Sequence, residues 1–432
     1  MSDSSKKIGV LIFPAGEVNS VELHDALSNC VNIRLYGASS YNRHGEYVFK
    51  NYTSGLPIVS DPQFIDAFNS LISKNKIDVV FPTHDTVAEF LSVHQSEIGA
   101  KIIVADTYTS EICRDKKKTF ELFRDCNFCP IIYTNITKYP VFVKPRKGQG
   151  GIGSFVIKTP ENANGIFDPD NMVICEFLPG EEFTVDCLTD KNGKLKGVFP
   201  RSRKRVLAGI TVGGSTEALT EEILYIAKTI NSRLHFLGLW YFQIKKSEDG
   251  QFKLLEISTR GSGTMCLTRA RGINLPLLSV YTAMGHDIDV FCNDYNVTVD
   301  RTFIARYKID YKYSRVYIDL DDTLVMNEKV CLNMIRFVYQ CFNKGIPMTL
   351  LTRHACDHKE NAEEYLKKCR IDSSLFDNII AVPLNKEKSD FISPPNAIFI
   401  DNAFTERKKV YDRCKIPVFD VDCIEVLLDW KT

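Results

Sequence analysis

The sequence lacks an excess of charge of either sign, because its 54 lysine and arginine residues equal its 54 aspartate and glutamate residues. No overall field therefore draws the protein toward nucleic acid or an anionic membrane, and any anion site must be local. The sequence also lacks an apolar run approaching the ~20 residues that span a bilayer, and it does not begin with the apolar segment of a signal peptide. These absences predict a cytoplasmic protein with neither nucleic acid nor membrane as a partner.

The cysteine pattern indicates neither a disulfide framework nor a zinc site. The 14 cysteines are scattered, and several, such as Cys175 and Cys187, stand within apolar stretches, which favours reduced thiols. Cys126 and Cys129 form a C-x-x-C pair, but no second pair stands at the spacing of zinc ligands. We interpret these two residues as ordinary cysteines at a helix end, with a metal or redox role as the alternative.

The order of apolar segments predicts three domains in a chain long enough for several cores. In residues 1–109 short apolar strands alternate with amphipathic helices, which is the rhythm of a parallel α/β sheet. Polar residues such as Thr83–Thr86 follow these strands, where such sheets usually place ligands, but the first turn lacks the G-x-G-x-x-G motif of dinucleotide sites. Residues 110–308 show paired strands with glycine-rich turns, as in an α+β domain. Residues 314–432 alternate strands and helices again, which predicts a second parallel α/β unit.

A glycine-rich stretch directly follows Val141–Pro145, which reads as a strand that ends in the cation Lys144. Glycines allow several backbone N–H groups to converge on phosphate oxygens. Because an apolar strand follows, the loop lies between two strands, unlike a Walker loop, which opens a helix. We therefore expect a strand–loop–strand flap over phosphates, with a plain hairpin as the alternative. The candidate phosphate-binding residues of the loop are Gly148, Gly150, Gly151, Gly153 and Ser154.

Two later segments carry the carboxylates that a hard cation prefers. One is Val173–Glu182, and the other is Leu254–Gly263, where Glu256 stands two residues before Ser258. A carboxylate beside an amide or hydroxyl, completed by phosphate oxygens and water, suits Mg²⁺. The order of these motifs, over roughly residues 8 to 300, resembles the ATP-grasp superfamily, especially its carbamoyl-phosphate-synthase-like branch.

This resemblance implies a pre-ATP-grasp α/β domain in residues 1–109 and an ATP-grasp α+β domain in residues 110–308. It implies ATP and Mg²⁺ as cofactors, with Mn²⁺ as the alternative ion. The residue roles that it implies are phosphate contacts for Lys116 and Lys144, an adenine hinge at Glu176, Phe177 and Leu178, a ribose contact for Glu182, metal ligation by Gln243, Glu256 and Ser258, and neutralisation of the transferred phosphoryl group by Arg260.

One position departs from the family pattern. Ser258 stands where the family usually has Asn, and a hydroxyl holds Mg²⁺ only weakly, so we expect an altered metal affinity, with an inactive site as the alternative. A basic cluster adds a substrate hypothesis, because an extended strand would place Arg201, Arg203 and Arg205 on one face. Three guanidinium groups there suit a carboxylate or phosphate. The alternative is a solvated charged face.

The C-terminal region contains a second set of acids. Asp319 and Asp321 stand where the buried strand Val316–Ile318 ends, and such a pair suits a carboxylate nucleophile with an acid/base neighbour. The D-x-D-x-T signature, followed by Leu350–Arg353 and Phe399–Asn402, resembles the haloacid-dehalogenase (HAD) superfamily of phosphatases. The resemblance covers roughly residues 314 to 420 and implies a Rossmann-like HAD domain. The spacing of its motifs leaves no room for a large cap.

By that resemblance Asp319 forms an aspartyl phosphate, Asp321 protonates the leaving group, and Thr352 holds the phosphoryl oxygens. Lys388 balances the charge, with Lys386 as the alternative. Asp401 completes the Mg²⁺ site with Asp319 and the backbone carbonyl of Asp321. Asn402 stands where a second acid is common, which indicates weakened metal binding.

Together these motifs predict a bifunctional enzyme. An ADP-forming ligase joins a carboxylate to an amine through an acyl phosphate, and a phosphatase acts on a phosphorylated compound of the same pathway. The alternatives are a carboxylate or small-molecule kinase with a corrective hydrolase, and a ligase with a degenerate regulatory HAD module. The expected partners are small carboxylates and amines, sugar-linked by analogy only, and a homodimer is expected from related enzymes.

Overall fold

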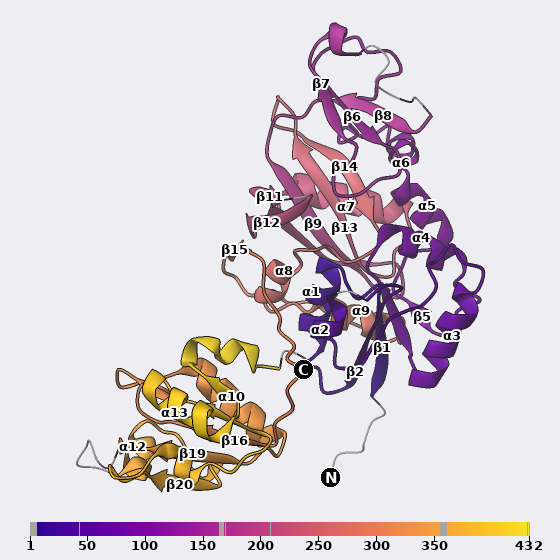
Figure 1. The fold of residues 1–432 in the computed structure, drawn as a ribbon. Helices are drawn as coiled ribbons and strands as arrows, with labels where there is room; N and C mark the ends of the chain where they lie inside the picture. Colours follow the sequence, from indigo (N-terminus) through magenta and orange to yellow (C-terminus); the bar gives the residue numbers. More distant parts are fainter. Residues whose placement is uncertain are drawn as a thin grey trace. The chain divides into compact units, whose positions relative to one another are not determined.

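The structure is a computed structural model, and it describes residues 7–42, 44–163, 168, 170–207, 209–354, 361–429 and 431. The chain divides into two compact units, Met1–Phe303 and Ile304–Lys431, and each is described by itself (Figure 1). No helix within the described ranges is both long enough and apolar enough to cross a bilayer.

The first unit begins with a five-stranded parallel sheet in the order β3-β2-β1-β4-β5. This arrangement confirms the parallel α/β pattern predicted for the N-terminal region. Its strands are β1 (Ile8–Phe13), β2 (Ile33–Ala38), β3 (Tyr52–Thr53), β4 (Val79–Pro82) and β5 (Lys101–Ile102). The helices of this region are α1 (Val18–Leu27), α2 (Gly45–Val48), α3 (Phe64–Asn75), α4 (Asp85–Val93), α5 (Thr107–Arg114) and α6 (Lys116–Leu122).

Strand β1 shows how the sheet is covered on both faces. Successive side chains of a strand point to opposite faces. Val10 and Ile12 pack in one hydrophobic cluster with residues of α1 and of the later helix α9 (Leu275–Ala283), whereas Leu11 and Phe13 pack in another with residues of α3 and α4. The near-continuous apolar run of this strand therefore reflects burial on both sides.

The middle of the first unit consists of smaller sheets. An antiparallel sheet has the order β10-β9-β13-β14, and two three-stranded sheets have the orders β7-β6-β8 and β11-β12-β15. The strands are β6 (Val141–Pro145), β7 (Phe155–Ile157), β8 (Met172–Glu176), β9 (Glu182–Thr189), β10 (Leu195–Ser202), β11 (Arg205–Leu207), β12 (Ile210–Ser215), β13 (Gly238–Lys246), β14 (Phe252–Ser258) and β15 (Thr298–Asp300). The remaining helices are α7 (Glu221–Arg233), α8 (Cys266–Ala270) and a 3₁₀ turn at Pro160–Ala163.

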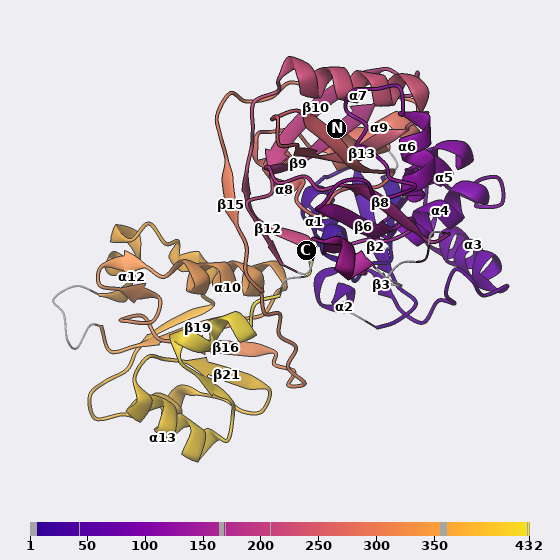
Figure 2. The same ribbon diagram turned by 90° about the horizontal axis from the view of Figure 1, so that it is seen from above.

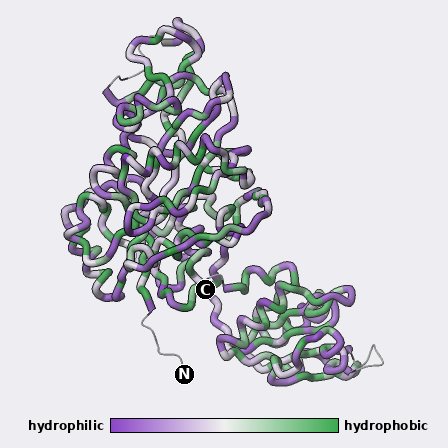
Figure 3. The backbone as a smooth tube through the Cα atoms, turned by 180° about the vertical axis from the view of Figure 1, so that it is seen from behind, coloured by the Kyte–Doolittle hydropathy of each residue, from purple (hydrophilic) through white to green (hydrophobic). Residues whose placement is uncertain are grey.

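The hydrophobic core crosses the boundary predicted at residue 109. The cluster around Val10 also contains Leu188 and Leu239 of the antiparallel sheet and Val280 of α9, so the first sheet and the following region share one core. Figure 3 shows hydrophobic stretches recurring along the chain of both units. The subdivision of the first unit at residue 109 stays a prediction.

The second unit is a five-stranded parallel sheet in the order β20-β19-β16-β21-β22. Its strands are β16 (Arg315–Ile318), β19 (Met348–Thr352), β20 (Asn378–Ala381), β21 (Ala397–Ile400) and β22 (Val418–Phe419), with a hairpin of β17 (Val325–Met326) and β18 (Lys329–Val330) after β16. Its helices are α10 (Leu332–Asn343), α12 (Ala362–Lys368) and α13 (Phe404–Cys414), with 3₁₀ turns at Ser373–Leu375, Lys388–Phe391 and Val421–Val426.

Helices cover both faces of this sheet, with α10 on one side and α13 on the other (Figure 2). Val316 and Ile318 of β16 pack with residues of α10, and Tyr317 between them packs with Val410 of α13. The unit begins ten residues before the predicted position 314, at Ile304. The reason is that residues of the segment before β16, such as Ile309, pack against the core of this unit.

Candidate active sites

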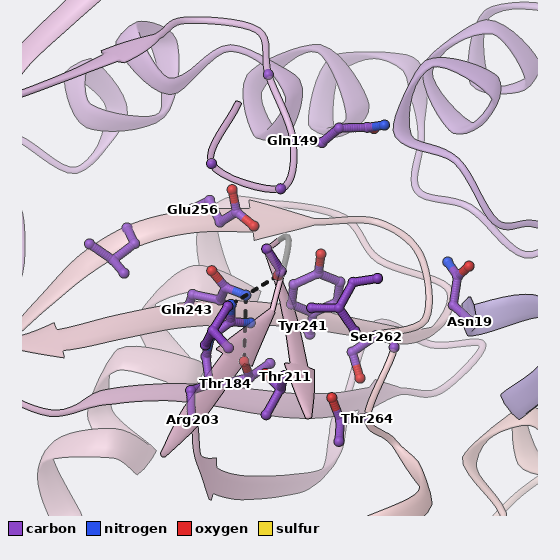
Figure 4. Close-up of a pocket in the computed structure, with 18 of the residues that line it drawn as sticks. Asn19, Gln149, Thr184, Arg203, Thr211, Tyr241, Gln243, Glu256, Ser262 and Thr264 are labelled. Atoms are coloured by element: carbon purple, nitrogen blue, oxygen red, sulfur yellow. Dashed lines mark hydrogen bonds between the residues drawn. The ribbon is translucent and has the colours of Figure 1, made fainter. Parts of the chain in front are cut away.

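The first unit contains a cavity of about 630 Å³ between the glycine-rich loop, the antiparallel sheet and the first sheet (Figure 4). Twelve residues predicted from the sequence contribute to its wall. They are Lys116, Lys144, Gly148, Gly150, Gly151, Ser154, Glu182, Arg201, Arg203, Gln243, Glu256 and Arg260. Six other predicted residues are not part of this wall: Gly153, Glu176, Phe177, Leu178, Arg205 and Ser258.

Two lysines bring positive charge to the cavity from different elements. Lys144 lies at the end of β6, where its Nζ donates to the carbonyl oxygen of Leu255 at 2.9 Å and lies 5.0 Å from the ring centre of Phe120. Burial lowers the pKa of Lys144. Lys116 opens α6, and its Nζ lies 3.8 Å from Glu256 Oε2. The cavity wall thus places Lys116 close to the carboxylate of Glu256, and Lys144 beside the strand that carries Glu256.

The candidate metal ligands Gln243 and Glu256 face each other across the β13–β14 pair. Figure 4 shows their side chains on one side of the cavity, with the loop that carries Gln149 on the other. Gln243 Nε2 donates to Thr184 Oγ1 at 3.5 Å, which leaves its amide oxygen to accept a cation. Mg²⁺ that is also held by the phosphates of a nucleotide needs few protein ligands. The carboxylate of Glu256 and the amide oxygen of Gln243 therefore fit this ion.

Ser258, the third predicted ligand, has another contact. Its hydroxyl donates to Asp85 Oδ1 at 3.0 Å, and it lines a small neighbouring pocket rather than the main cavity. Asp85 comes from the start of α4 and also binds Arg260 through Nε at 2.9 Å and Nη2 at 2.8 Å. Burial alone would raise the pKa of Asp85, but the charge and hydrogen bonds of Arg260 and the Ser258 hydroxyl outweigh it and lower that pKa. Arg260 is therefore held in a fixed orientation at the cavity wall.

The glycine-rich loop lies between the antiparallel strands β6 and β7, as the sequence predicts. Arg114 Nη1 donates to the carbonyl oxygen of Gly148 at 3.1 Å. A nitrogen of the Gln149 amide lies 2.8 Å from Nε2 of His84. His84 Nδ1 accepts from the backbone N–H of Thr86, so Nε2 must carry the proton of the neutral ring, and the amide oxygen of Gln149 belongs at that position. The loop is thus bound by His84, the N-cap residue of α4, and by Arg114 of α5.

The arginine cluster does not have the predicted arrangement. Strand β10 ends at Ser202 and β11 begins at Arg205, so the three arginines do not share a face of one strand. Arg201 is buried and binds Asp186 at 3.1 and 3.2 Å, because a buried guanidinium needs a partner. Arg203 pairs with Glu182 at 2.7 Å. Arg205 is exposed, pairs with Asp300 and lies outside the cavity wall, so the prediction of one basic face was wrong.

The predicted adenine hinge follows β8. The backbone N–H of Glu176 donates to the carbonyl oxygen of Ile131 at 2.9 Å, and its carboxylate accepts from the N–H of Ile131 at 2.9 Å. Phe177 is partly exposed and Leu178 is buried. The hinge role of these residues stays a prediction.

The cavity wall also contains residues that were not among the predicted site residues, such as His84, Tyr241 and Gln149. Burial raises the pKa of Tyr241 to about 12, and its ring lies 5.5 Å from the guanidinium of Arg260. The polar stretch after β4 signalled a ligand crevice that includes His84. Nothing in the sequence indicated which later residues it would meet.

The second unit brings Asp319, Lys388 and Asp401 together at the carboxyl ends of its parallel strands. Lys388 Nζ lies 2.7 Å from Asp319 Oδ1 and 2.6 Å from Asp401 Oδ2, and all three side chains are buried. Burial raises the pKa of Asp319, although Lys388 opposes this effect. Burial by itself would lower the pKa of Lys388, but the negative charges of Asp319 and Asp401 outweigh burial and raise this pKa. Lys386, the alternative, instead accepts a hydrogen bond from Arg353 through its backbone carbonyl.

Asp321 lies beside a different set of residues. Its Oδ1 is 2.7 Å from Nδ1 of His354, and its Oδ2 accepts from the hydroxyl of Thr352 at 3.4 Å. Asn402, the departure from the family pattern, accepts from Thr323 Oγ1 at 3.3 Å and donates its backbone N–H to the same hydroxyl at 3.0 Å. Asn402 therefore has a structural role in joining the loops after β16 and β21.

Within the described ranges, no three His, Cys, Asp or Glu side chains gather into a group that could hold a metal ion by themselves. Mg²⁺ does not need such a group, because it keeps water and binds through one or two carboxylates plus phosphate oxygens. In the second unit, Asp319 Oδ2 accepts a weak hydrogen bond from Thr323 Oγ1 at 3.5 Å. Asp319 and Asp401 therefore offer two carboxylates that fit a magnesium ion.

Comparison with known proteins bears on the first unit. The family described as "ATP-grasp in the biosynthetic pathway with Ter operon" matches residues 168–303, which contain Glu182, Gln243, Glu256 and Arg260. A carbamoyl-phosphate synthase of Methanobrevibacter smithii is 22% identical over 245 residues, which make up 49% of this chain and 65% of that protein. A D-alanine–D-alanine ligase of Thermotoga petrophila is 28% identical over 131 residues, 27% of this chain and 43% of that protein. The chain thus spans less than two thirds of these curated relatives.

A solved structure has the same fold at low sequence identity. The complex of biotin carboxylase from Campylobacter jejuni with β-γ-ATP matches with a TM-score of 0.54 and 15% identity, covering 67% of this chain and 73% of that one. Residues 168–303 are thus similar to an ATP-grasp family, and the chain shares the fold of a biotin carboxylase over about two thirds of its length.

Proposed function

We propose that the first unit is an ATP-dependent carboxylate–amine ligase that works through an acyl phosphate. The observation that carries this proposal is the single cavity whose wall combines Lys116, Lys144, the glycine-rich loop, Glu256 and Arg260. Those groups supply positive charge, backbone N–H donors and a metal-binding carboxylate, and they include no nucleophile. Such a set suits phosphoryl transfer, in which positioning and charge neutralisation provide most of the catalysis.

In this proposal an oxygen of the carboxylate substrate attacks the γ-phosphorus of ATP, and ADP leaves. The amine nitrogen then attacks the acyl carbon, phosphate leaves, and the amine loses a proton to solvent, which gives an amide. Lys144 and Lys116 bind phosphate oxygens, and Arg260, fixed by Asp85, faces the transferred group. Bound Mg²⁺, held by Glu256 and Gln243, would screen the negative charge of the phosphates.

The named activities of the relatives support this choice of reaction class. One is a carbamoyl-phosphate synthase, one is a D-alanine–D-alanine ligase, and the structural neighbour binds an ATP analogue. We extend no substrate from them to this chain. A small carboxylate and a small amine are the proposed substrates, and a homodimer is the proposed assembly.

The test is the release of ADP from Mg²⁺-ATP across a panel of carboxylates, with and without amines. We expect ADP release to require both a carboxylate and an amine. This release should be lost in Glu256→Gln and kept in Glu248→Gln, which makes the same change at an exposed position of the same hairpin. Release without any amine would indicate a kinase instead. Equal rates in Glu256→Gln and wild type would contradict the assigned metal site.

We further propose that the second unit is a HAD-type phosphatase without a large cap. The supporting observation is the convergence of Asp319, Lys388 and Asp401 at the ends of neighbouring parallel strands, with Asp321 on the following loop. Between β16 and β19 the chain forms only the β17–β18 hairpin and α10, which is too little for a large cap at this position. Asp319, Asp401 and the backbone carbonyl of Asp321 would hold Mg²⁺, which would screen the phosphoryl charge.

The proposed reaction has two steps. Asp319 attacks phosphorus, and the ester oxygen leaves with a proton from Asp321, so that an aspartyl phosphate forms. Water then attacks that phosphorus while Asp321 takes its proton, and phosphate leaves Asp319. Lys388 compensates the negative charge of Asp319 and Asp401 throughout.

Hydrolysis of an aromatic phosphate ester tests this proposal. We expect activity in the wild type and in Asp412→Asn, which changes an exposed acid on α13, and loss of activity in Asp319→Asn. Equal residual rates in Asp319→Asn and wild type would favour the alternative of a degenerate regulatory module.

A further inference from the structure

His354 is a residue of the second site that the sequence motifs do not include. It follows β19 by two positions, and its Nδ1 lies 2.7 Å from Asp321 Oδ1. Oδ1 is an acceptor both in the ionised carboxylate and in the acid that carries its proton on Oδ2, so the proton of this contact lies on Nδ1 of the imidazole. Thr352 joins the same group, because its hydroxyl contacts Asp321 Oδ2 at 3.4 Å and accepts the backbone N–H of His354 at 2.9 Å.

The two partners differ greatly in exposure. The side chain of Asp321 is 35% exposed, whereas that of His354 is 1% exposed. The imidazole stacks on the ring of Tyr365 in α12, with ring centres 4.4 Å apart and an angle of 20° between the planes. A rigid, buried donor therefore holds a carboxylate that lies on an exposed loop and would otherwise be free to rotate.

The contact distances also distinguish the two oxygens of Asp321. Among the residues that the structure describes, Oδ1 has a short hydrogen bond to His354 and Oδ2 has a long contact to Thr352. A hydrogen bond at 2.7 Å to a carboxylate is strong, whereas one at 3.4 Å is at the limit of the usual range. Oδ2 is thus the oxygen left to exchange a proton with a substrate.

We propose that His354 is a positioning residue that fixes Asp321 by its Oδ1 and so directs Oδ2 toward the phosphate ester; this inference rests on the proposed phosphatase activity. In the first step the proton on Oδ2 moves to the ester oxygen as its bond to phosphorus breaks and the bond from Asp319 forms. In the second step Oδ2 takes a proton from water as the bond between water oxygen and phosphorus forms and the bond to Asp319 breaks. Fixing the carboxylate lowers the entropy lost in reaching these geometries.

The test compares two substitutions that differ in one hydrogen bond. In His354→Asn the amide nitrogen occupies nearly the place of Nδ1 and can donate to Asp321, whereas His354→Leu fills similar space without a donor. Each variant is assayed with 4-nitrophenyl phosphate, whose leaving group needs little protonation, and with an alkyl phosphate, whose leaving group needs it fully. The parameter is kcat/KM, which reports the steps up to cleavage of the ester.

We expect His354→Leu to lose kcat/KM by about 10-fold or more with the alkyl phosphate and by less than about 3-fold with the nitrophenyl ester, since general acid catalysis contributes about 10²–10⁴-fold. His354→Asn should recover most of the alkyl phosphate activity. Equal losses with both esters, or no recovery in His354→Asn, would overturn the positioning role, because a merely structural defect lowers both activities alike.

The same assay separates this inference from the phosphatase proposal. If Asp319→Asn is inactive but His354→Leu keeps the wild-type ratio of the two esters, only the role of His354 fails. If the wild type hydrolyses neither ester, or Asp319→Asn equals the wild type, the phosphatase proposal fails and the role of His354 fails with it. A thermal unfolding curve of each variant identifies any variant that does not fold. If His354→Leu does not fold, the ratio of the kcat/KM values of His354→Asn for the two esters is compared with that of the wild type.

Discussion

Removing the carboxylate of Asp85 should destabilise the first unit and disturb its cavity. Asp85 forms two hydrogen bonds with Arg260, at 2.9 and 2.8 Å, and accepts a third from Ser258 at 3.0 Å. The side chains of Asp85 and Arg260 are only 17% and 14% exposed. Asp85→Asn keeps the size of the side chain but leaves the guanidinium of Arg260 without its counter-charge.

The expected magnitude follows from this burial. Breaking a buried ion pair by removing one partner costs about 3–5 kcal/mol, because the remaining charge is left uncompensated. The residual exposure of both side chains places Asp85→Asn near the lower end, at about 3 kcal/mol. Arg260→Gln should cost less than this, since it leaves a carboxylate near the Ser258 hydroxyl. The double variant should cost less than the sum of the two, by about 1–3 kcal/mol of coupling.

The assay is urea unfolding followed by tryptophan fluorescence. The chain has two tryptophans, Trp240 in the first unit and Trp430 near the C-terminus, so Trp430→Phe as a background confines the signal to the first unit. The matched control is Asp287→Asn, which removes the exposed partner of Lys191 and should not change the midpoint measurably. A cost of Asp85→Asn below about 1 kcal/mol, or costs that simply add in the double variant, would refute the reasoning.

The pH dependence of this cost has a definite sign. The pKa of Asp85 is lower in the folded chain than its ordinary value, so folding favours the ionised form. The stability that the carboxylate supplies is therefore complete above its unfolded pKa of about 3.9 and is lost as the pH falls through the folded value. The difference between wild type and Asp85→Asn should be constant near neutral pH and shrink only in acid.

Three further predictions concern the two sites. Gly209→Ala should raise the KM for ATP, because a Cβ there would overlap the carbonyl oxygen of Gly150. Gly193→Ala, at the same φ of 77° but with no atom within 4 Å of the added Cβ, should change only stability. Equal KM values in the two variants would contradict the loop contact. Lys144→Met should abolish ADP release while leaving the unfolding midpoint of the first unit unchanged or higher, because it removes a buried charge, and a large loss of stability would contradict this. Lys388→Met should abolish ester hydrolysis and lower the unfolding temperature of the second unit, since two buried carboxylates lose their shared cation, while Lys386→Met should do neither.

The sequence alone predicted the elements that carry the sites with good accuracy. Val141–Pro145 was expected as a strand and is β6, and the glycine-rich loop was expected between two strands and lies between β6 and β7. The parallel order of the first sheet followed from alternating apolar strands and helices. These features depend on residues close together in the chain, whose periodicity and turn chemistry act locally.

Predictions that required a strand to continue without interruption were less successful. Arg201, Arg203 and Arg205 were placed on one strand face, but the chain leaves β10 after Ser202, and the buried Asp186 of β9 takes Arg201 into the core. The three arginines do stand at alternate positions of the sequence. Strand β10 nevertheless ends before Arg203, because the next segment, β11, pairs with β12. A period of two in the sequence does not reveal where a ladder stops.

The sequence by itself determined which residues could act as ligands, cations and phosphate-binding backbone, because these properties belong to the residue and its neighbours along the chain. Only the tertiary structure decided which of them meet. Asp85 binds Arg260 across 175 positions of sequence, and Asp321 meets His354 across 33, in contacts set by the packing of sheets and helices. The physical reason is that a buried charge takes whichever partner the fold brings within reach, and that partner is fixed by long-range packing rather than by any local pattern.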